Sequence, residues 1–91
     1  MNIDLLIKMA NEISAFFATE SLPERAPADV AAHLIRYWDP RMRAQIVTYY
    51  EERHGAGLED IARSAVEIVA AQAKAKVAAA TAAASRAPGS G

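Results

Sequence analysis

The sequence contains no cysteine, only six aromatic residues and no long uninterrupted run of apolar residues. Without cysteine the chain forms no disulfide and supplies no thiolate ligand to zinc or to an iron–sulfur cluster. No stretch approaches the roughly 20 apolar residues that a membrane-spanning helix needs. The opening residues MNIDLLIKMANE carry a charge every few positions, which is not typical of a signal peptide. We therefore expect a soluble protein without a membrane contact, and the lack of cysteine favours the cytoplasm.

Charge of one sign is also lacking, because ten basic and eleven acidic residues give a formal net charge of −1. A balance this even provides no bulk attraction to nucleic acid or to an anionic membrane. The length of 91 residues allows one small domain. Such a domain buries only about 60–65% of the surface that its unfolded chain exposes, so its own core is marginal.

Apolar residues recur at helical spacing along most of the chain, which predicts an all-α fold, a small bundle of three to four helices. The predicted helices cover residues 3–19, 27–38, 40–54 and 58 onward. The predicted buried stripe of the first helix is Leu6, Met9, Ile13, Phe16 and Phe17, opposite Asp4, Lys8, Asn11 and Glu12. For Met9, Phe16 and Phe17 the alternative to the core is a groove for a partner or ligand. The predicted buried face of the second helix is Val30, Leu34, Tyr37 and Trp38.

Proline and glycine mark the helix ends. Proline disfavours helical backbone in the residue before it and suits the first turn of a new helix, so Asp39-Pro40 should end one helix and begin the next. Asp39 can cap the new helix by accepting backbone N–H groups. Gly55-Ala56-Gly57 should end the third helix, with Gly55 as a left-handed cap.

The composition changes after Gln72, where the apolar seam of the fourth helix is interrupted. We divide the chain into a helical domain, residues 1–72, and a flexible alanine-rich tail, residues 73–91. Alanine is the best helix former, so the fourth helix could continue to about Ala84. A helix with little to bury is marginal in water, and we expect fraying or disorder beyond about residue 75.

No constellation of reactive side chains is evident. His33 and His54 lie on different predicted helices, and a carboxylate one turn before each does not complete a metal site. Gly55-Ala56-Gly57 stands between helices without the preceding strand of a phosphate-binding loop. We predict no catalytic, cofactor-binding or metal-binding residue, and therefore no catalysis by the isolated chain.

The stretch from His33 to Arg43 is the candidate interaction site. Arginine, tyrosine and tryptophan are enriched in interface hot spots, because each buries a large area and still carries a polar group. The predicted partner-binding residues are His33, Arg36, Tyr37, Trp38, Arg41 and Arg43. Alternatively, Tyr37 and Trp38 belong to the core and the arginines are solvated, with Arg43 pairing with Asp39 four residues earlier.

The segment HLIRYWDPRMR, together with MANEI at residues 9–13 and Phe16-Phe17, resembles the delta subunit of the soluble NAD-dependent formate dehydrogenases. The resemblance covers residues 4–71. It implies a multi-subunit enzyme that oxidises formate to carbon dioxide and passes electrons to NAD. A molybdenum or tungsten pterin centre, iron–sulfur clusters and flavin would lie in other subunits. The implied partner is the catalytic alpha subunit, whose assembly or stability this chain would assist. Whether an arginine of this chain contacts a pterin phosphate in that subunit is left open.

A second function class is a small helix-turn-helix-like nucleic-acid-binding regulator. Two helices meeting at a tight corner, with Arg41 and Arg43 opening the second, have that general form. The slightly negative net charge and the bare Asp-Pro turn argue against it.

Overall fold

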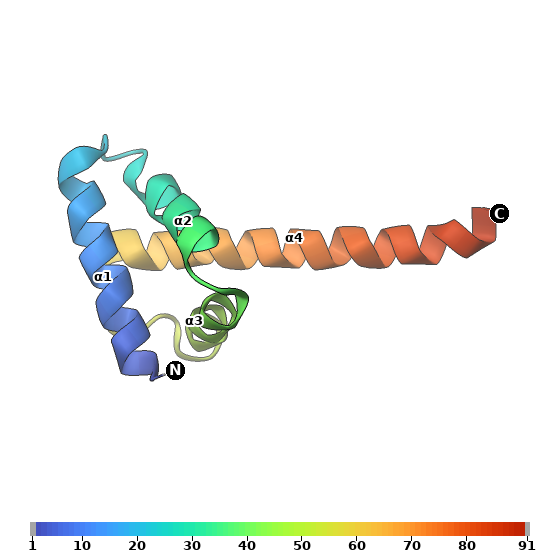
Figure 1. Cartoon of the computed structure of the whole chain (residues 1–91), viewed down its shortest axis with the longest axis horizontal. Coiled ribbons are helices and arrows are strands. Elements are labelled where there is room, and N and C mark those ends of the chain that lie inside the picture. The colour runs from blue at the N-terminus through green and yellow to red at the C-terminus, as the bar shows by residue number, and fades with distance from the viewer. Residues whose placement is uncertain (1, 91) are drawn as a thin grey trace.

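The chain folds into four helices, with a bundle at one end and a projecting helix at the other (Figure 1). The computed structural model describes the backbone of residues 2–90 and the side chains of residues 2–80. The helices are α1 (Ile3–Glu20), α2 (Ala26–Tyr37), α3 (Pro40–Arg53) and α4 (Asp60–Ser90). Residues 2–90 contain no strand, so the predicted all-α fold is confirmed. Each predicted helix is present, and its start and the ends of α1 to α3 agree within two residues.

The core lies where α1, α2 and α3 gather around the first three turns of α4 (Figure 1). It consists of Leu6, Ala10, Val30, Ala31, Leu34, Trp38, Ile46, Leu58, Ala62, Ala65, Val66 and Val69. Small side chains on α4, such as Ala62 and Ala65, let the neighbouring helices approach closely, and α2 packs most extensively against it. The N-terminal part of α4 is therefore the centre of the bundle.

Two aromatic residues predicted to be buried lie on the surface instead. Phe16 is 59% exposed and Tyr37 is 65% exposed. In both helices most of the buried residues follow a row with a spacing of four, and Ala31 is buried beside the row of α2. The row in α1 is Leu6, Ala10 and Ser14, and the row through α2 is Ala26, Val30, Leu34 and Trp38. At about 100° per residue, Phe16 lies about 160° from Ser14, away from the buried row of α1, whereas Tyr37 lies beside Leu34 and Trp38 at the end of α2.

Burial along α4 ends at Ala70, and residues 71–80 are all exposed. This agrees with the predicted interruption of the apolar seam at Gln72. The backbone continues as helix to Ser90 and carries α4 away from the bundle (Figure 1). The division into a domain and a tail, and fraying of the tail, stay predictions, and the tail side chains beyond residue 80 lie outside the described residues.

The loop between α3 and α4 begins one residue earlier than predicted. His54 already has left-handed backbone, with φ 57°, and Gly55 follows with φ 71°. A Cβ atom on Gly55 would lie 3.2 Å from side-chain atoms of both Leu58 and Tyr50. Backbone angle and space both require glycine at position 55.

Candidate functional site

The corner between α2 and α3 is built from two helix caps. Trp38 ends α2 in an extended conformation, and its N–H donates to the carbonyl oxygen of Leu34 at 3.0 Å. Asp39 begins α3, and its carboxylate oxygen Oδ1 accepts hydrogen bonds from the N–H groups of Arg41 at 2.9 Å and Met42 at 3.0 Å. The predicted break at Asp39-Pro40 and the predicted capping role of Asp39 are confirmed.

Trp38 and Arg43 make contacts within the chain that stabilise the corner. The Trp38 side chain is only 5% exposed and belongs to the core. Nη1 of Arg43 donates to the carbonyl oxygens of Ile35 at 2.8 Å and Trp38 at 2.7 Å. The guanidinium therefore occupies the C-terminal end of α2, where free carbonyls and the helix dipole favour a cation.

The alternative in which Arg43 pairs with Asp39 is wrong. The ion pairs among the described residues are Arg63 with Asp60 and Lys74 with Glu51. Asp39 binds backbone N–H groups at the start of α3, and Arg43 binds backbone carbonyls at the end of α2. The two side chains therefore cap helices and do not pair with each other.

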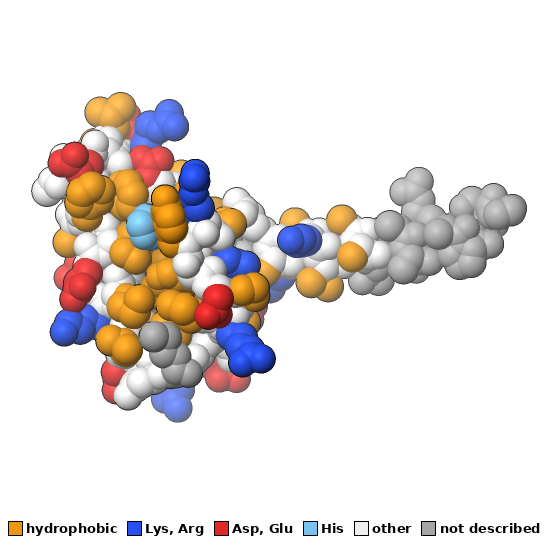
Figure 2. All heavy atoms as spheres, in the orientation of Figure 1, with side chains coloured by type: hydrophobic (Ala, Val, Ile, Leu, Met, Phe, Trp, Pro, Cys, Tyr) orange, Lys and Arg blue, Asp and Glu red, His pale blue; other side chains and the backbone are white. Residues whose placement is uncertain are grey.

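His33, Arg36 and Tyr37 come together on the outer face of α2. The rings of His33 and Tyr37 lie 4.7 Å apart between centroids, and the Arg36 guanidinium carbon lies 5.6 Å from the centroid of the Tyr37 ring. The arginine distance is in the range of a cation–π contact. Figure 2 shows a histidine between hydrophobic side chains, with a basic side chain beside them.

The cluster continues onto α1. The ring of Phe17 lies 5.9 Å from His33, and the ring of Phe16 packs edge-on against Phe17 at 5.1 Å. We call the set Phe16, Phe17, His33 and Tyr37, ended by Arg36, the aromatic row. The sequence favoured the core for both phenylalanines, with a groove for a partner or ligand as the alternative; Phe17 is partly buried against the core, whereas Phe16 is exposed. Neighbouring helical residues point about 100° apart, and this signal could have placed one of them outside.

Arg41 lies exposed on the first turn of α3. Its backbone N–H is bound to Asp39, whereas its guanidinium makes no hydrogen bond or ion pair with the described residues. The six predicted partner-binding residues thus divide in two. Arg36, Tyr37 and Arg41 are exposed and His33 is half-buried, and Trp38 and Arg43 hold the corner.

Two further properties can be stated for the described residues. Their histidine, aspartate and glutamate side chains form no group of three or more that could hold a metal ion. None of their helices is both long and apolar enough to cross a bilayer. What the surface offers to a ligand is aromatic rings and guanidinium groups.

The chain was compared with models of protein families. The family model of the NADH-dependent formate dehydrogenase delta subunit, FdsD, matches residues 5–66. The chain belongs to this delta-subunit family. The predicted resemblance is therefore confirmed, over α1, α2, α3 and the packed start of α4. No curated protein and no solved structure matches the chain.

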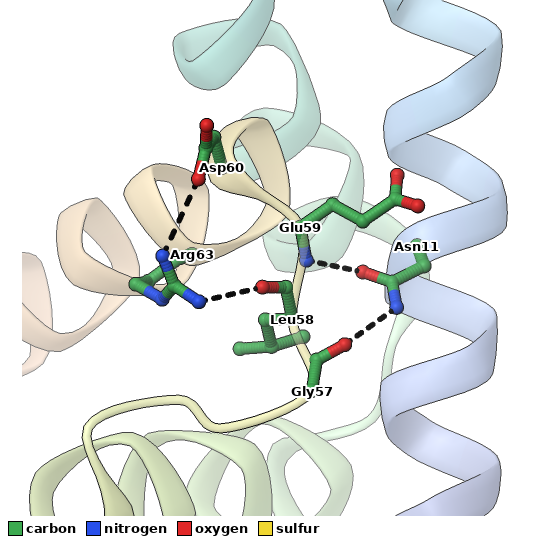
Figure 3. Close-up of polar contacts among 6 residues, drawn as sticks. All are labelled: Asn11, Gly57, Leu58, Glu59, Asp60 and Arg63. Carbon is green, nitrogen blue, oxygen red and sulfur yellow. Dashed lines mark hydrogen bonds and ion pairs between the residues drawn. The ribbon is translucent and has the colours of Figure 1, made fainter.

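The chain also contains a polar clamp that the sequence did not reveal (Figure 3). Nδ2 of Asn11 donates to the carbonyl oxygen of Gly57, and Oδ1 of Asn11 accepts from the N–H of Glu59, both at 2.9 Å. Nη2 of Arg63 donates to the carbonyl oxygen of Leu58 at 2.8 Å. These contacts fix the start of α4 against α1, and no local pattern indicates them because Asn11 lies 46 and 48 residues from its partners.

Proposed function

We propose that the delta subunit is a non-catalytic docking subunit, which binds the catalytic alpha subunit of formate dehydrogenase through the aromatic row and Arg41. The observation that carries the proposal is the aromatic row itself. Two of its rings, Phe16 and Tyr37, are more than half exposed, although burying them would stabilise the small core of this chain. Contiguous exposed apolar surface beside polar residues marks interaction sites in soluble proteins.

The row is also preorganised for binding. Each ring contacts the next, from Phe16 through Phe17 and His33 to Tyr37, so the free side chains already have restricted rotamers. Ordering a mobile side chain at an interface costs about 0.5–1.5 kcal/mol, and a stacked row has lost part of that freedom before the partner arrives. Tyrosine and arginine at its open end are hot-spot residue types.

In this proposal the complex oxidises formate to carbon dioxide and reduces NAD, while the delta subunit assists assembly or stabilises the alpha subunit. The molybdenum or tungsten pterin centre, the iron–sulfur clusters and the flavin are assigned to other subunits, because this chain has no cysteine to ligate a cluster. A location in the cytoplasm stays a prediction.

The test is Tyr37→Ala combined with Arg36→Ala, in a chain co-expressed with the alpha subunit. Truncating a hot spot costs about 2 kcal/mol of binding, so we expect the affinity to fall about 30-fold or more. Exposed substitutions change the free energy of unfolding by less than about 0.5 kcal/mol, so the helical circular dichroism and melting should be nearly unchanged. Co-purification and a binding titration measure the affinity, and circular dichroism and thermal melting measure the stability.

The matched control is Leu22→Ala with Arg25→Ala, an exposed apolar residue and an exposed arginine in the connection between α1 and α2. This pair should bind like the wild type. If the Tyr37 and Arg36 variant is retained on the alpha subunit as well as the control, the aromatic row is not the docking surface.

The nucleic-acid alternative gains no support from the structure. Of the two arginines that would open its recognition helix, Arg43 is bound to the carbonyls of α2. A titration with duplex DNA at several salt concentrations tests it, since a nucleic-acid-binding protein would show tight binding with a steep salt dependence.

A further inference from the structure

A second surface, on other residues than the aromatic row, lies between α3 and the outward run of α4. It is a groove with an apolar floor formed by Ile35, Val47, Val69 and Ala73, and with Arg43 and Lys76 at its edge. An adjoining hollow shares Val47 and Ala73 and continues along α4 to Val77 and Ala78. We call the two together the α3–α4 groove.

The α3–α4 groove carries positive charge without a compensating anion. The part that contains Arg43 and Lys76 has no carboxylate in its lining. Glu51, in the adjoining hollow, is already paired with Lys74 at 3.3 Å. Lys76 makes no ion pair with the described residues, so its charge is available to a ligand.

Arg43 adds donors to that charge. Its two hydrogen bonds to the carbonyls of α2 both use Nη1. The Nε and Nη2 edge of the guanidinium makes no hydrogen bond with the described residues. An arginine edge with two parallel N–H groups is the one that binds a carboxylate in bidentate fashion. A ligand with a carboxylate above an apolar surface is therefore complementary to the groove.

The shape favours a helix over an extended segment. The lining residues of α4 recur on successive turns from Val69 to Ala78, so the groove follows the helix axis. Backbone groups of the surrounding helices are already paired, and an extended peptide would find few partners for its own N–H and C=O groups there. A helix brings its hydrogen bonds with it, and alanines on α4 let it approach closely.

We propose that the α3–α4 groove binds an acidic amphipathic helix from another subunit of the formate dehydrogenase complex. Apolar side chains of that helix cover Val47, Ala73 and Val77, and its carboxylates meet Arg43 and Lys76. The inference rests on the proposed docking function but concerns a different face of the chain. It also gives the exposed run of α4 a packing partner, which an alanine-rich helix outside a bundle needs for stability.

The first experiment is photocross-linking in the assembled complex of the full-length chain. A benzophenone amino acid replaces Ala73 in the groove or, as control, Ser64 on an exposed position of α4. From position 73 we expect a cross-link to an acidic helical segment of another subunit, identified by mass spectrometry. A cross-link to a second copy of this chain, or no cross-link above the Ser64 control, overturns the proposal.

The second experiment reverses one charge. Lys76→Glu should weaken binding to the complex about tenfold, with the largest difference from wild type at low salt. Lys8→Glu, on an exposed position of α1, makes the same charge change and should bind like the wild type. Equal affinity of the two variants overturns the groove proposal. If Lys76→Glu binds normally while the Tyr37 and Arg36 variant is released, the groove proposal fails and the aromatic row stands; the reverse result would locate docking at the groove.

Discussion

The two connections on either side of α3 differ in how far apart in the sequence their hydrogen-bond partners lie. At the α2–α3 corner, Asp39 and Arg43 cap the two helices through partners no more than eight residues away. In the α3–α4 loop, Asn11 supplies two hydrogen bonds across 46 and 48 residues. The caps of the corner need only its two helices. The loop also has local contacts, such as the Tyr49 hydroxyl donating to the carbonyl oxygen of Ala56 at 2.6 Å, but it depends on α1 for the two hydrogen bonds from Asn11. The corner thus depends on local hydrogen bonds, whereas the loop also depends on tertiary ones.

The largest effect should come from removing the core side chain beneath the corner. Trp38→Ala deletes a buried indole, and losses of about 3–5 kcal/mol are typical of such truncations. In so small a domain this loss should unfold much of the population, which urea denaturation followed by far-ultraviolet circular dichroism would detect. Trp38→Phe, which keeps most of the apolar volume, should lose clearly less. Equal, small losses for both variants would mean that the local caps alone hold the corner.

An intermediate effect is expected at the loop. Asn11→Ala removes both hydrogen bonds of the clamp and should cost about 1–2 kcal/mol of stability. Amide exchange at Glu59 should become faster while exchange at Met42, in the corner, stays the same. Lys8→Ala, one turn earlier on the exposed surface of α1, serves as control and should change stability by less than about 0.5 kcal/mol. Faster exchange at both connections would show that they are not independent.

The smallest effect separates two arginines of the corner. Arg43→Ala removes two hydrogen bonds to the end of α2 and should cost about 1 kcal/mol, because the site is only partly buried. Arg41→Ala removes a guanidinium without an internal partner and should change the free energy of unfolding by less than about 0.5 kcal/mol. Thermal unfolding of the two variants measures the difference. Identical melting would contradict the capping role of Arg43.

Local signals in the sequence predicted most of the fold. Proline after Asp39 and the glycines after His54 act on their own neighbours, so helix ends could be placed within two residues. Side-chain burial was less predictable, because residues on the flank of an apolar stripe turn inward or outward according to how neighbouring helices pack. Phe16 and Tyr37 were predicted to be buried and are exposed.

The candidate site shows the same division. The exposure of Arg36 and Arg41 and the role of Asp39 follow from helical spacing and capping rules. The contact of Phe17 with His33 joins two helices, and the orientation of Arg43 depends on carbonyls left free at the end of α2. Spacing favoured a pair between Arg43 and Asp39, but both side chains bind backbone groups that the helix ends leave unpaired. Tertiary geometry therefore decides which edge of Arg43 binds the chain itself and which edge is left for a ligand.

The central position of α4 has a consequence for the order in which the protein is made. Synthesis delivers α1 first, yet the residues that cover Leu6 and Ala10, and the backbone groups that Asn11 binds, include ones made near the end of the bundle. A nascent chain that stops after α3 leaves its apolar rows open to water and to other proteins. We therefore expect the bundle to fold only after the first turns of α4 have left the ribosome, and a chain that stops after α3 to lose the whole bundle.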